Sequence, residues 1–168
     1  MPVIRRLYLP ALIPQLLAIA ALGVGIHFCF PRLDVIPSIA IAAIVYPIFC
    51  RVLRETFAHD HAAGMRAYKA QHFEEAISHF EASYRFFLAH PLTDKCRSLL
   101  FGVATQNPYR VIALCNMAYC YTQIGNGNKA IELFEQALQE SPECTLARTS
   151  LSMLRSVSPV SDSKPAVS

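Results

Sequence analysis

The stretch AYCYTQIGNGNKAIELFEQALQESP, residues 118–142, decides how the polar part of this chain folds. Its apolar residues recur at three- and four-residue spacing on both sides of a central Gly-Asn-Gly-Asn run, and that spacing is typical of one helix face. The central run indicates a turn, because glycine accepts positive φ and asparagine caps helix ends. We therefore predict two helices joined by a tight turn, with Pro142 closing the second helix.

The same pattern occurs once more, earlier in the chain. Glu-Ala-Ile-x-x-Phe at residues 75–80 superposes on Lys-Ala-Ile-x-x-Phe at residues 129–134, with an offset of 54 residues. Small residues let two helices cross closely, and the phenylalanine fills the groove beside the crossing. The sequence thus predicts two helical pairs, at about 57–90 and 109–141.

The second unit resembles the tetratricopeptide repeat family. It matches the family pattern at Ala118, Tyr121, Gly125, Ala130, Phe134, Ala137 and Pro142. The first unit keeps Gly64, Phe73, Ala76, Phe80 and Ser83, although its tyrosine is displaced to Tyr68. Family members repeat about every 34 residues. The longer offset here therefore implies an insertion, which we place at residues 91–107.

The chain continues past the second pair with one more helical pattern. Residues 143–156 have a single apolar face, and we expect them to cap the open end of the stack. Such stacks usually need about three units to bury a continuous core, so support is expected from the insertion, the N-terminal helices or self-association. Residues 157–168 include six Ser or Pro and are expected to be disordered.

Residues 1–54 differ in composition from the helical domain predicted at 55–156. They hold only six of the 27 charged side chains, and uncharged runs extend from Leu7 to Phe30 and from Val35 to Cys50. As helices these runs reach about 36 Å and about 24 Å, against a hydrocarbon core of roughly 30 Å. We predict a transmembrane helical hairpin, and the fold class is all-α.

The orientation of this hairpin follows from its flanking charges. Arg5, Arg6, Arg51 and Arg54 lie at its base, whereas the turn carries Arg32 alone. The positive-inside rule then predicts an integral membrane protein with two spans, and with both termini and the helical domain cytoplasmic. A cleaved signal peptide is the alternative, which the length of the first run and the presence of a second run disfavour.

The turn and the small residues of the hairpin give further expectations. Asp34 is placed to cap the second helix. Ala21-x-x-x-Gly25 and Ser38-x-x-x-Ala42 allow close helix approach. Packing of the two helices on each other explains that spacing, and homo-oligomerisation through the same face is left open.

The tetratricopeptide resemblance also implies a binding face, lined by the first helix of each pair. Carried over by position, its members are His61, Met65, Tyr68, Lys69, Cys115, Asn116, Tyr119, Thr122 and Gln123. A mixture of aromatic and polar side chains suits a protein or peptide partner, with Tyr68 and Tyr119 as anchors. In the alternative, several of these residues pack against the insertion instead.

Other chemistry is disfavoured by the motifs. The sequence has no nucleophile elbow, phosphate-binding loop or His-Glu-x-x-His, so we expect neither catalytic residues nor a cofactor. His59-Asp60-His61 is not expected to bind metal, because residues two apart on a helix diverge. The basic balance belongs to the hairpin, with +4 in residues 1–54 and −1 in the rest, so nucleic acid is not an expected partner.

Two polar clusters beside the insertion are left with two interpretations. Asp94-Lys95-Cys96-Arg97 and Tyr109-Arg110 fit a functional role and fit helix-end capping equally well. Our leading hypothesis for the whole chain is a membrane-anchored adaptor that binds a protein partner through the helical pairs. The alternatives are a structural or assembly subunit that contacts a larger membrane complex through the hairpin, and, with least support, a membrane enzyme.

Overall fold

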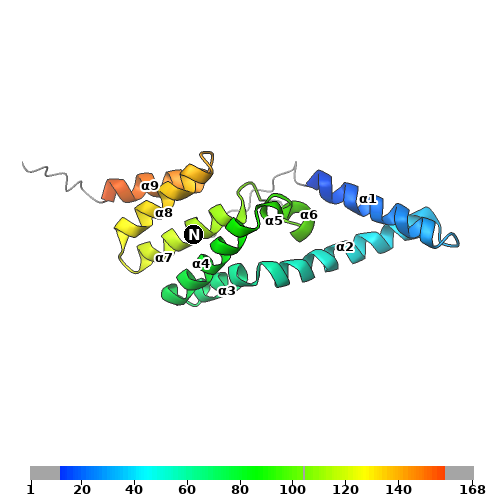
Figure 1. The fold of residues 1–168 in the computed structure, drawn as a ribbon, viewed down its shortest axis with the longest axis horizontal. Helices are drawn as coiled ribbons and strands as arrows, with labels where there is room; N and C mark the ends of the chain where they lie inside the picture. The colour runs from blue at the N-terminus through cyan, green and yellow to red at the C-terminus, as the bar shows by residue number, and fades with distance from the viewer. Residues whose placement is uncertain (1–11, 104, 158–168) are drawn as a thin grey trace, which may run out of the picture.

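A computed structural model describes residues 12–103 and 105–157. The described residues are all-helical, with the hairpin at one end of an elongated molecule and the last helical pair at the other (Figure 1). The helices are α1 Leu12–Cys29, α2 Val35–Phe57, α3 His59–Lys69, α4 Phe73–Ala89, α5 Pro91–Lys95, α6 Arg97–Phe101, α7 Tyr109–Gln123, α8 Gly127–Glu140 and α9 Thr145–Val157. The disorder expected for the tail lies outside the described residues, except at Val157, which ends α9.

Helices α1 and α2 form an antiparallel hairpin that is closest at Gly23. A Cβ atom at Gly23 would lie 2.9 Å from Cγ1 of Ile39, and Ser38 and Ala42 are fully buried in the same contact. Gly25, by contrast, has open space around its Cα. The expected small-residue contact is therefore correct for α2 and wrong for α1, where Gly23 takes the place assigned to Gly25.

The hairpin turn is closed by groups other than the expected cap. Asp34 is the N-cap residue of α2, but its carboxylate makes no capping hydrogen bond. The Ser38 hydroxyl instead donates to the Asp34 carbonyl oxygen at 3.0 Å, and His27 Nδ1 lies 2.7 Å from the Leu33 carbonyl oxygen. These two contacts, made by side chains of α1 and α2, stabilise the turn in place of the expected Asp34 cap.

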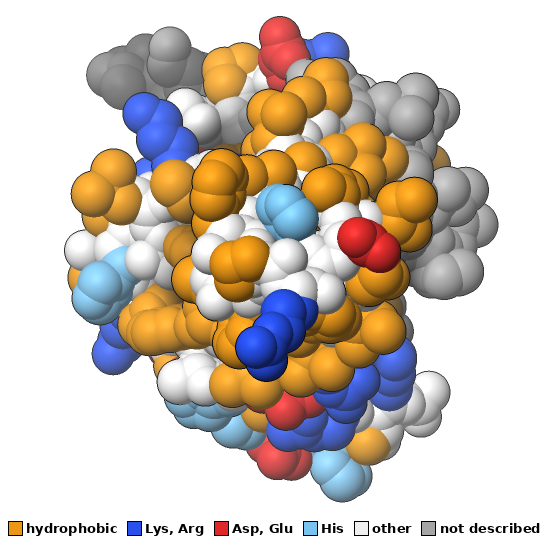
Figure 2. Space-filling model, turned by 90° about the vertical axis from the view of Figure 1, so that its right-hand side faces the viewer, with side chains coloured by type: hydrophobic (Ala, Val, Ile, Leu, Met, Phe, Trp, Pro, Cys, Tyr) orange, Lys and Arg blue, Asp and Glu red, His pale blue; other side chains and the backbone are white. Residues whose placement is uncertain are grey.

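The outside of the hairpin is apolar. Both helices are long and apolar enough to cross a membrane, and only 6% of the α1 window and 17% of the α2 window is buried within the chain. Of the 22 exposed large hydrophobic residues in the described chain, 17 lie between Ile13 and Phe57. Figure 2 shows hydrophobic side chains over much of the face at this end. Such a surface needs a cover of lipid or protein.

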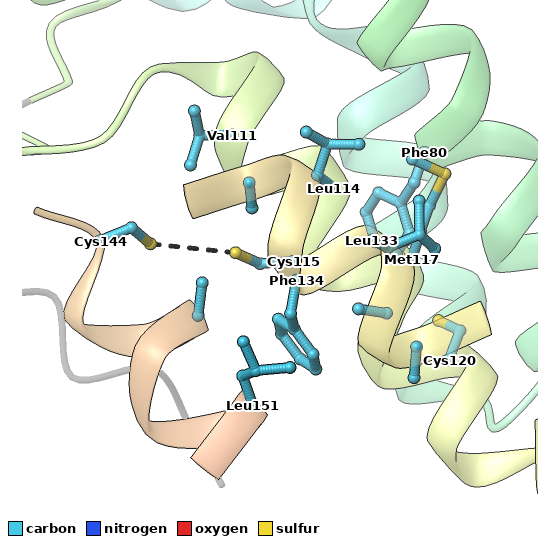
Figure 3. Close-up of a cluster of buried hydrophobic side chains, with 14 of the residues drawn as sticks. Phe80, Val111, Leu114, Cys115, Met117, Cys120, Leu133, Phe134, Cys144 and Leu151 are labelled. Carbon is cyan, nitrogen blue, oxygen red and sulfur yellow. Dashed lines mark hydrogen bonds between the residues drawn. The ribbon is translucent and has the colours of Figure 1, made fainter. Parts of the chain in front are cut away.

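The helical pairs α3–α4 and α7–α8 share one core, to which α9 adds. Phe80 and Phe134, the equivalent phenylalanines of the two units, are fully buried (Figure 3). A Cβ atom at Gly64 would lie 2.8 Å from the Phe80 ring, and Ala130 is fully buried beside Phe134. Small residues therefore permit the crossings that the repeat pattern predicts.

The turns inside the two pairs have the same hydrogen bonds but different residues. In the second pair Gly125 takes φ +79° and Asn126 N donates to the Tyr121 carbonyl oxygen. Gln71 takes the equivalent left-handed position at φ 63°, followed by His72 N donating to the Ala67 carbonyl oxygen. The first unit thus has Gln71 where the second unit has Gly125. Gln71 adopts a left-handed conformation that residues other than glycine seldom adopt, so its backbone is strained.

The insertion forms α5 and α6 and connects the hairpin to the helical pairs. Phe87 on α4 stacks on Tyr109 of α7 at 4.8 Å between ring centroids, and Phe101 of α6 meets both rings edge-on. Ala58, directly after α2, is buried in the same cluster. A second, smaller core therefore lies where the hairpin, the insertion and the repeat units meet.

Candidate functional site

The nine residues expected on the binding face come from α3 and α7. The two helices approach each other at Met65 and Asn116, where Asn116 Nδ2 lies 3.6 Å from Met65 Sδ. Side chains of the two first helices therefore meet at this point, although α7 packs mainly against α4 and α8. The structure divides the nine side chains between the core and the surface.

Cys115 is a core residue, and its expected place on an exposed face is wrong. Its side chain is 1% exposed, and its sulfur lies 4.0 Å from the sulfur of Cys144, as the dashed line in Figure 3 marks. The hydrogen bond to Cys144, together with burial, raises the pKa of the Cys115 thiol. A neutral, enclosed thiol of this kind fills space and offers nothing to an external partner.

Cys144 is a residue that sequence reasoning missed. Cys144 directly precedes α9. Its sulfur is hydrogen-bonded to Cys115 and to backbone groups of the first turn of α9, and these hydrogen bonds lower the pKa of the Cys144 thiol. Asn107 Nδ2 also donates to this sulfur at 3.4 Å. The sequence signal that could have indicated a structural role for Cys144 is its position two residues after Pro142, just before a new helix begins. The arrangement joins α7 to the start of α9.

His61 is partly exposed, and its ring packs inward from α3. Its ring lies 5.6 Å from the Phe80 ring and 5.0 Å from the Tyr109 ring, and Ser83 Oγ is 3.4 Å from Nδ1. Burial lowers the pKa of His61 to about 4. The imidazole is therefore neutral at pH 7 and packs between α4 and α7.

The His61 imidazole makes stability depend on pH. The unfolded chain binds a proton at this residue below about pH 6.5, whereas the folded chain resists it down to pH 4. Stability from the neutral His61 is present above pH 6.5 and is lost as the pH falls. Between pH 7.5 and pH 5 we expect a loss of about 2 kcal/mol in the free energy of unfolding, measured by denaturant titration in detergent.

The variant His61→Leu removes this titration. The loss in the free energy of unfolding between pH 7.5 and pH 5 should therefore be about 2 kcal/mol smaller in the variant than in the parent. The variant Gln139→Ala is a control, since it changes an exposed side chain that carries no charge and leaves His61 in place. A His61→Leu protein that loses as much stability as the parent between the two pH values would contradict the assignment.

The two tyrosines expected as anchors have partners within the chain. The Tyr119 hydroxyl lies 2.8 Å from Ser150 Oγ on α9, and its ring meets Phe134 edge-on at 5.5 Å. Tyr68 is half-buried, with its ring 5.9 Å from Phe73. Both rings show only part of their surface to solvent. Replacing either would disturb the fold as well as a binding face.

The exposed part of the face is therefore smaller and more polar than expected. Lys69 and Gln123 are exposed, and Met65, Asn116 and Thr122 are partly exposed. Thr122 Oγ1 donates to the Tyr119 carbonyl oxygen at 2.6 Å, so its hydroxyl is paired within α7. Two open hollows of the described residues lie elsewhere, at the turns formed by residues 71–75 and 124–128. The face is a surface for contact rather than a pocket.

The polar cluster of the insertion is explained by helix capping. Asp94 is 3% exposed, and its Oδ1 accepts from Tyr109 N at 2.7 Å while its Oδ2 accepts from Arg110 N at 3.4 Å. The two amides belong to the first turn of α7, whose N–H groups have no acceptor within the helix itself. Arg97 donates to the carbonyl oxygens of Asp94, Thr105 and Gln106, and desolvation lowers its pKa.

The second polar cluster joins three helices. Arg110 Nε on α7 lies 2.9 Å from Glu140 Oε2 on α8, and the Tyr84 hydroxyl on α4 donates to Glu140 Oε1 at 2.9 Å. Gln136 Nε2 donates to the Tyr84 oxygen. This network holds the two helical pairs together.

The structure does not bring the three side chains of the His59-Asp60-His61 run together. His59 Nε2 lies 3.3 Å from Asp60 Oδ1, and His79 Nδ1 lies 3.6 Å from the same oxygen, whereas His61 turns into the core. Within residues 12–103 and 105–157 no group of three or more metal-binding side chains was found. His59 and Asp60 therefore lie on the surface of α3, and the His61 ring points toward the core.

Comparison with known families gives a match at the unit that has the complete pattern. Residues 111–144 match the model of the tetratricopeptide repeat. The match covers most of α7 and all of α8, and it supports assignment of this part of the chain to that family, whose repeats are typically non-catalytic interaction modules. No curated protein and no solved structure matches the chain.

Proposed function

We propose that this protein is a membrane-anchored adaptor that binds a protein or peptide partner through the exposed face of α3 and α7. The hairpin α1–α2 spans the bilayer, with both termini and the helical pairs on the cytoplasmic side. The observation that carries the proposal is the joining of an almost uncovered apolar hairpin to a tetratricopeptide repeat.

The binding role is supported by the family and by the surface. Tetratricopeptide domains commonly bind proteins. Among the residues expected on the face, Lys69 is an exposed cation, Asn116 and Gln123 carry amides, and the Tyr68 ring is partly exposed. A mixture of this kind suits a peptide that offers a carboxylate and apolar side chains.

The anchoring role is supported by the hairpin. Its outward side chains are apolar along both helices, and the base of α2 carries Arg51 and Arg54. Arginines at the end of a span favour the cytoplasmic leaflet. Confinement to a membrane raises the effective concentration of the domain toward other membrane components.

A structural subunit of a larger membrane complex is the second candidate. One observation favours it, namely that Gly25 and its surroundings on α1 are left open by α2. Another transmembrane helix could approach there closely. In that case the hairpin carries the contacts and the helical pairs serve as a dock.

The adaptor proposal predicts that charge changes on the face abolish partner capture. The variant Lys69→Glu/Gln123→Glu alters two exposed side chains that support no packing, so folding should be unaffected. We expect crosslinking and affinity capture from native membranes to recover at least tenfold less of the specific partners, equivalent to about 1.4 kcal/mol of binding. The control Arg85→Glu/Gln139→Glu makes the same changes of charge at exposed positions of α4 and α8, and also removes the exposed Arg85–Glu81 ion pair.

The two candidate functions separate in a third variant. Gly25→Leu fills the open side of α1 and should leave an adaptor's partners in place, but should release those of a structural subunit. Unchanged capture by the face variant, together with loss in Gly25→Leu, would reject the adaptor. Topology is tested by a reporter fused after Ser168, and activity only outside the cytoplasm would overturn the proposed orientation.

A further inference from the structure

The short helix α6 is held by side chains of the hairpin. Gln15 Nε2 on α1 donates to the Ser98 carbonyl oxygen at 3.0 Å. From α2, the Tyr46 hydroxyl donates to the Leu99 carbonyl oxygen at 2.7 Å, and Cys50 Sγ donates to the same oxygen at 3.5 Å. A five-residue helix leaves its last carbonyl groups without partners, and these are the groups that the hairpin satisfies.

The position of these donors gives the depth of α6 if the hairpin spans a bilayer. Tyr46 and Cys50 belong to the uncharged run that ends before Arg51. Tyr46 is five residues from Arg51, which is about 7.5 Å along a helix. The Leu99 carbonyl thus lies on the membrane side of the first cation. Unpaired carbonyl groups are costly at such depth, so donors from Gln15 and Tyr46 matter there.

The surface around this contact is apolar. Outside the hairpin the described chain has five exposed large hydrophobic residues, and three of them, Leu88, Leu92 and Leu99, lie within residues 88–99. Leu92 is 75% exposed. The other two, Ile124 and Met153, lie at the turn after α7 and on α9. Exposed apolar residues of the helical domain are therefore concentrated next to the hairpin.

The charge of the same segment is suited to lipid headgroups. Lys95 is exposed at the end of α5, whereas the neighbouring carboxylate of Asp94 is buried against α7. The Asp94 carboxylate is thus buried, whereas the Lys95 ammonium group is exposed to solvent. A cation beside exposed leucines is the arrangement that binds an anionic membrane surface.

We propose that the insertion α5–α6 is a membrane-interface element. Leu92 and Leu99 contact the boundary between headgroups and acyl chains, and Lys95 contacts headgroup phosphates. This inference rests on the proposed anchoring by α1–α2 and adds a second lipid contact, which fixes the orientation of the helical domain. The end of α4 and the start of α7 then lie near the bilayer, and α8 and α9 point away from it (Figure 1).

The chain contains no tryptophan, so single-tryptophan variants report without background. The full-length variants Leu92→Trp, Ile44→Trp and Met153→Trp would be reconstituted in vesicles of phosphatidylcholine and phosphatidylglycerol with brominated acyl chains. All three side chains are exposed, so the fold should accept the exchange. Bromine quenches tryptophan only at close range, and bromine near the headgroup distinguishes the interface from the bilayer centre.

Under the proposal, Leu92→Trp loses at least half of its emission with bromine near the headgroup. Ile44→Trp is quenched most by bromine deep in the chain, and Met153→Trp keeps its emission in both. The added exchange Lys95→Glu should reduce the quenching of Leu92→Trp in anionic vesicles. The variant Leu88→Trp, on α4, gives an independent second probe of the same surface.

The outcomes separate this inference from the proposed anchoring. Quenching of Ile44→Trp without quenching of Leu92→Trp and Leu88→Trp overturns the interface element and leaves the anchored hairpin in place. Absence of quenching at Ile44→Trp overturns the anchoring, and with it the inference. Equal quenching at Leu92→Trp and Met153→Trp would show non-specific adsorption of the whole domain and would also overturn the proposal.

Discussion

Replacement of Asp94 with Ala is expected to lower the free energy of unfolding by about 1 to 3 kcal/mol, the range for removing the partner of buried hydrogen-bonding groups. The carboxylate is 3% exposed and caps α7 through Tyr109 N and Arg110 N, and its charge favours the charged form of Arg97. Its removal takes away both capping contacts and the favourable charge interaction with the Arg97 guanidinium. Denaturant titration of the full-length protein in detergent, followed by circular dichroism, measures the loss.

Two further variants test the cause of this effect. Asp94→Asn keeps an oxygen acceptor for Tyr109 N but removes the charge, so it should cost less than Asp94→Ala. Lys95→Ala changes the exposed neighbour and should stay within about 0.5 kcal/mol of the parent. A loss below 1 kcal/mol for Asp94→Ala would contradict the capping role.

The second large effect is expected at Phe80, whose replacement by Ala should cost about 3 to 5 kcal/mol. The ring is fully buried, faces Gly64 across the α3–α4 crossing and meets the His61 ring edge-on. Its removal leaves a cavity in the core that α3, α4 and α7 share. The same denaturant titration gives the change in unfolding free energy.

A double-mutant cycle identifies the contact behind this cost. Gly64→Ala alone should destabilise by about 1 to 3 kcal/mol, because the new Cβ would lie 2.8 Å from the Phe80 ring. In the Phe80→Ala background the collision is absent, and the exchange should instead stabilise by up to about 1 kcal/mol through helix propensity. If Gly64→Ala has the same effect in both backgrounds, the helices do not cross at this point.

The repeat pattern allowed much of the fold to be predicted from the sequence. Ala76, Phe80, Ala130 and Phe134 are all fully buried, and α4 ends at Ala89, one residue before the predicted limit of the first pair. These positions were predictable because a small residue followed by a phenylalanine at helical spacing can bury both side chains in few arrangements other than a close helix crossing. The family match at residues 111–144 confirms the unit in which the pattern is complete.

The binding face was less predictable because its packing depends on residues outside the repeat pattern. The His61 ring packs against Tyr109, and Cys115 is covered by Cys144, which lies outside the two helical pairs. Helical spacing identifies one face of a helix but not which distant segment covers it. The same limit explains the hairpin, since on an apolar helix Gly23 and Gly25 are equally plausible contacts until the register is known.

The position of the second core has a consequence for how the chain is made. Ala58 and Phe87 are covered by Phe101 and Tyr109, which leave the ribosome later. At 5 to 20 residues per second, Tyr109 follows Ala58 after roughly 3 to 10 s. During this interval the hairpin is complete while its attachment site on the helical domain is still unformed. The two N-terminal helices are therefore complete before the domain that packs against them can close.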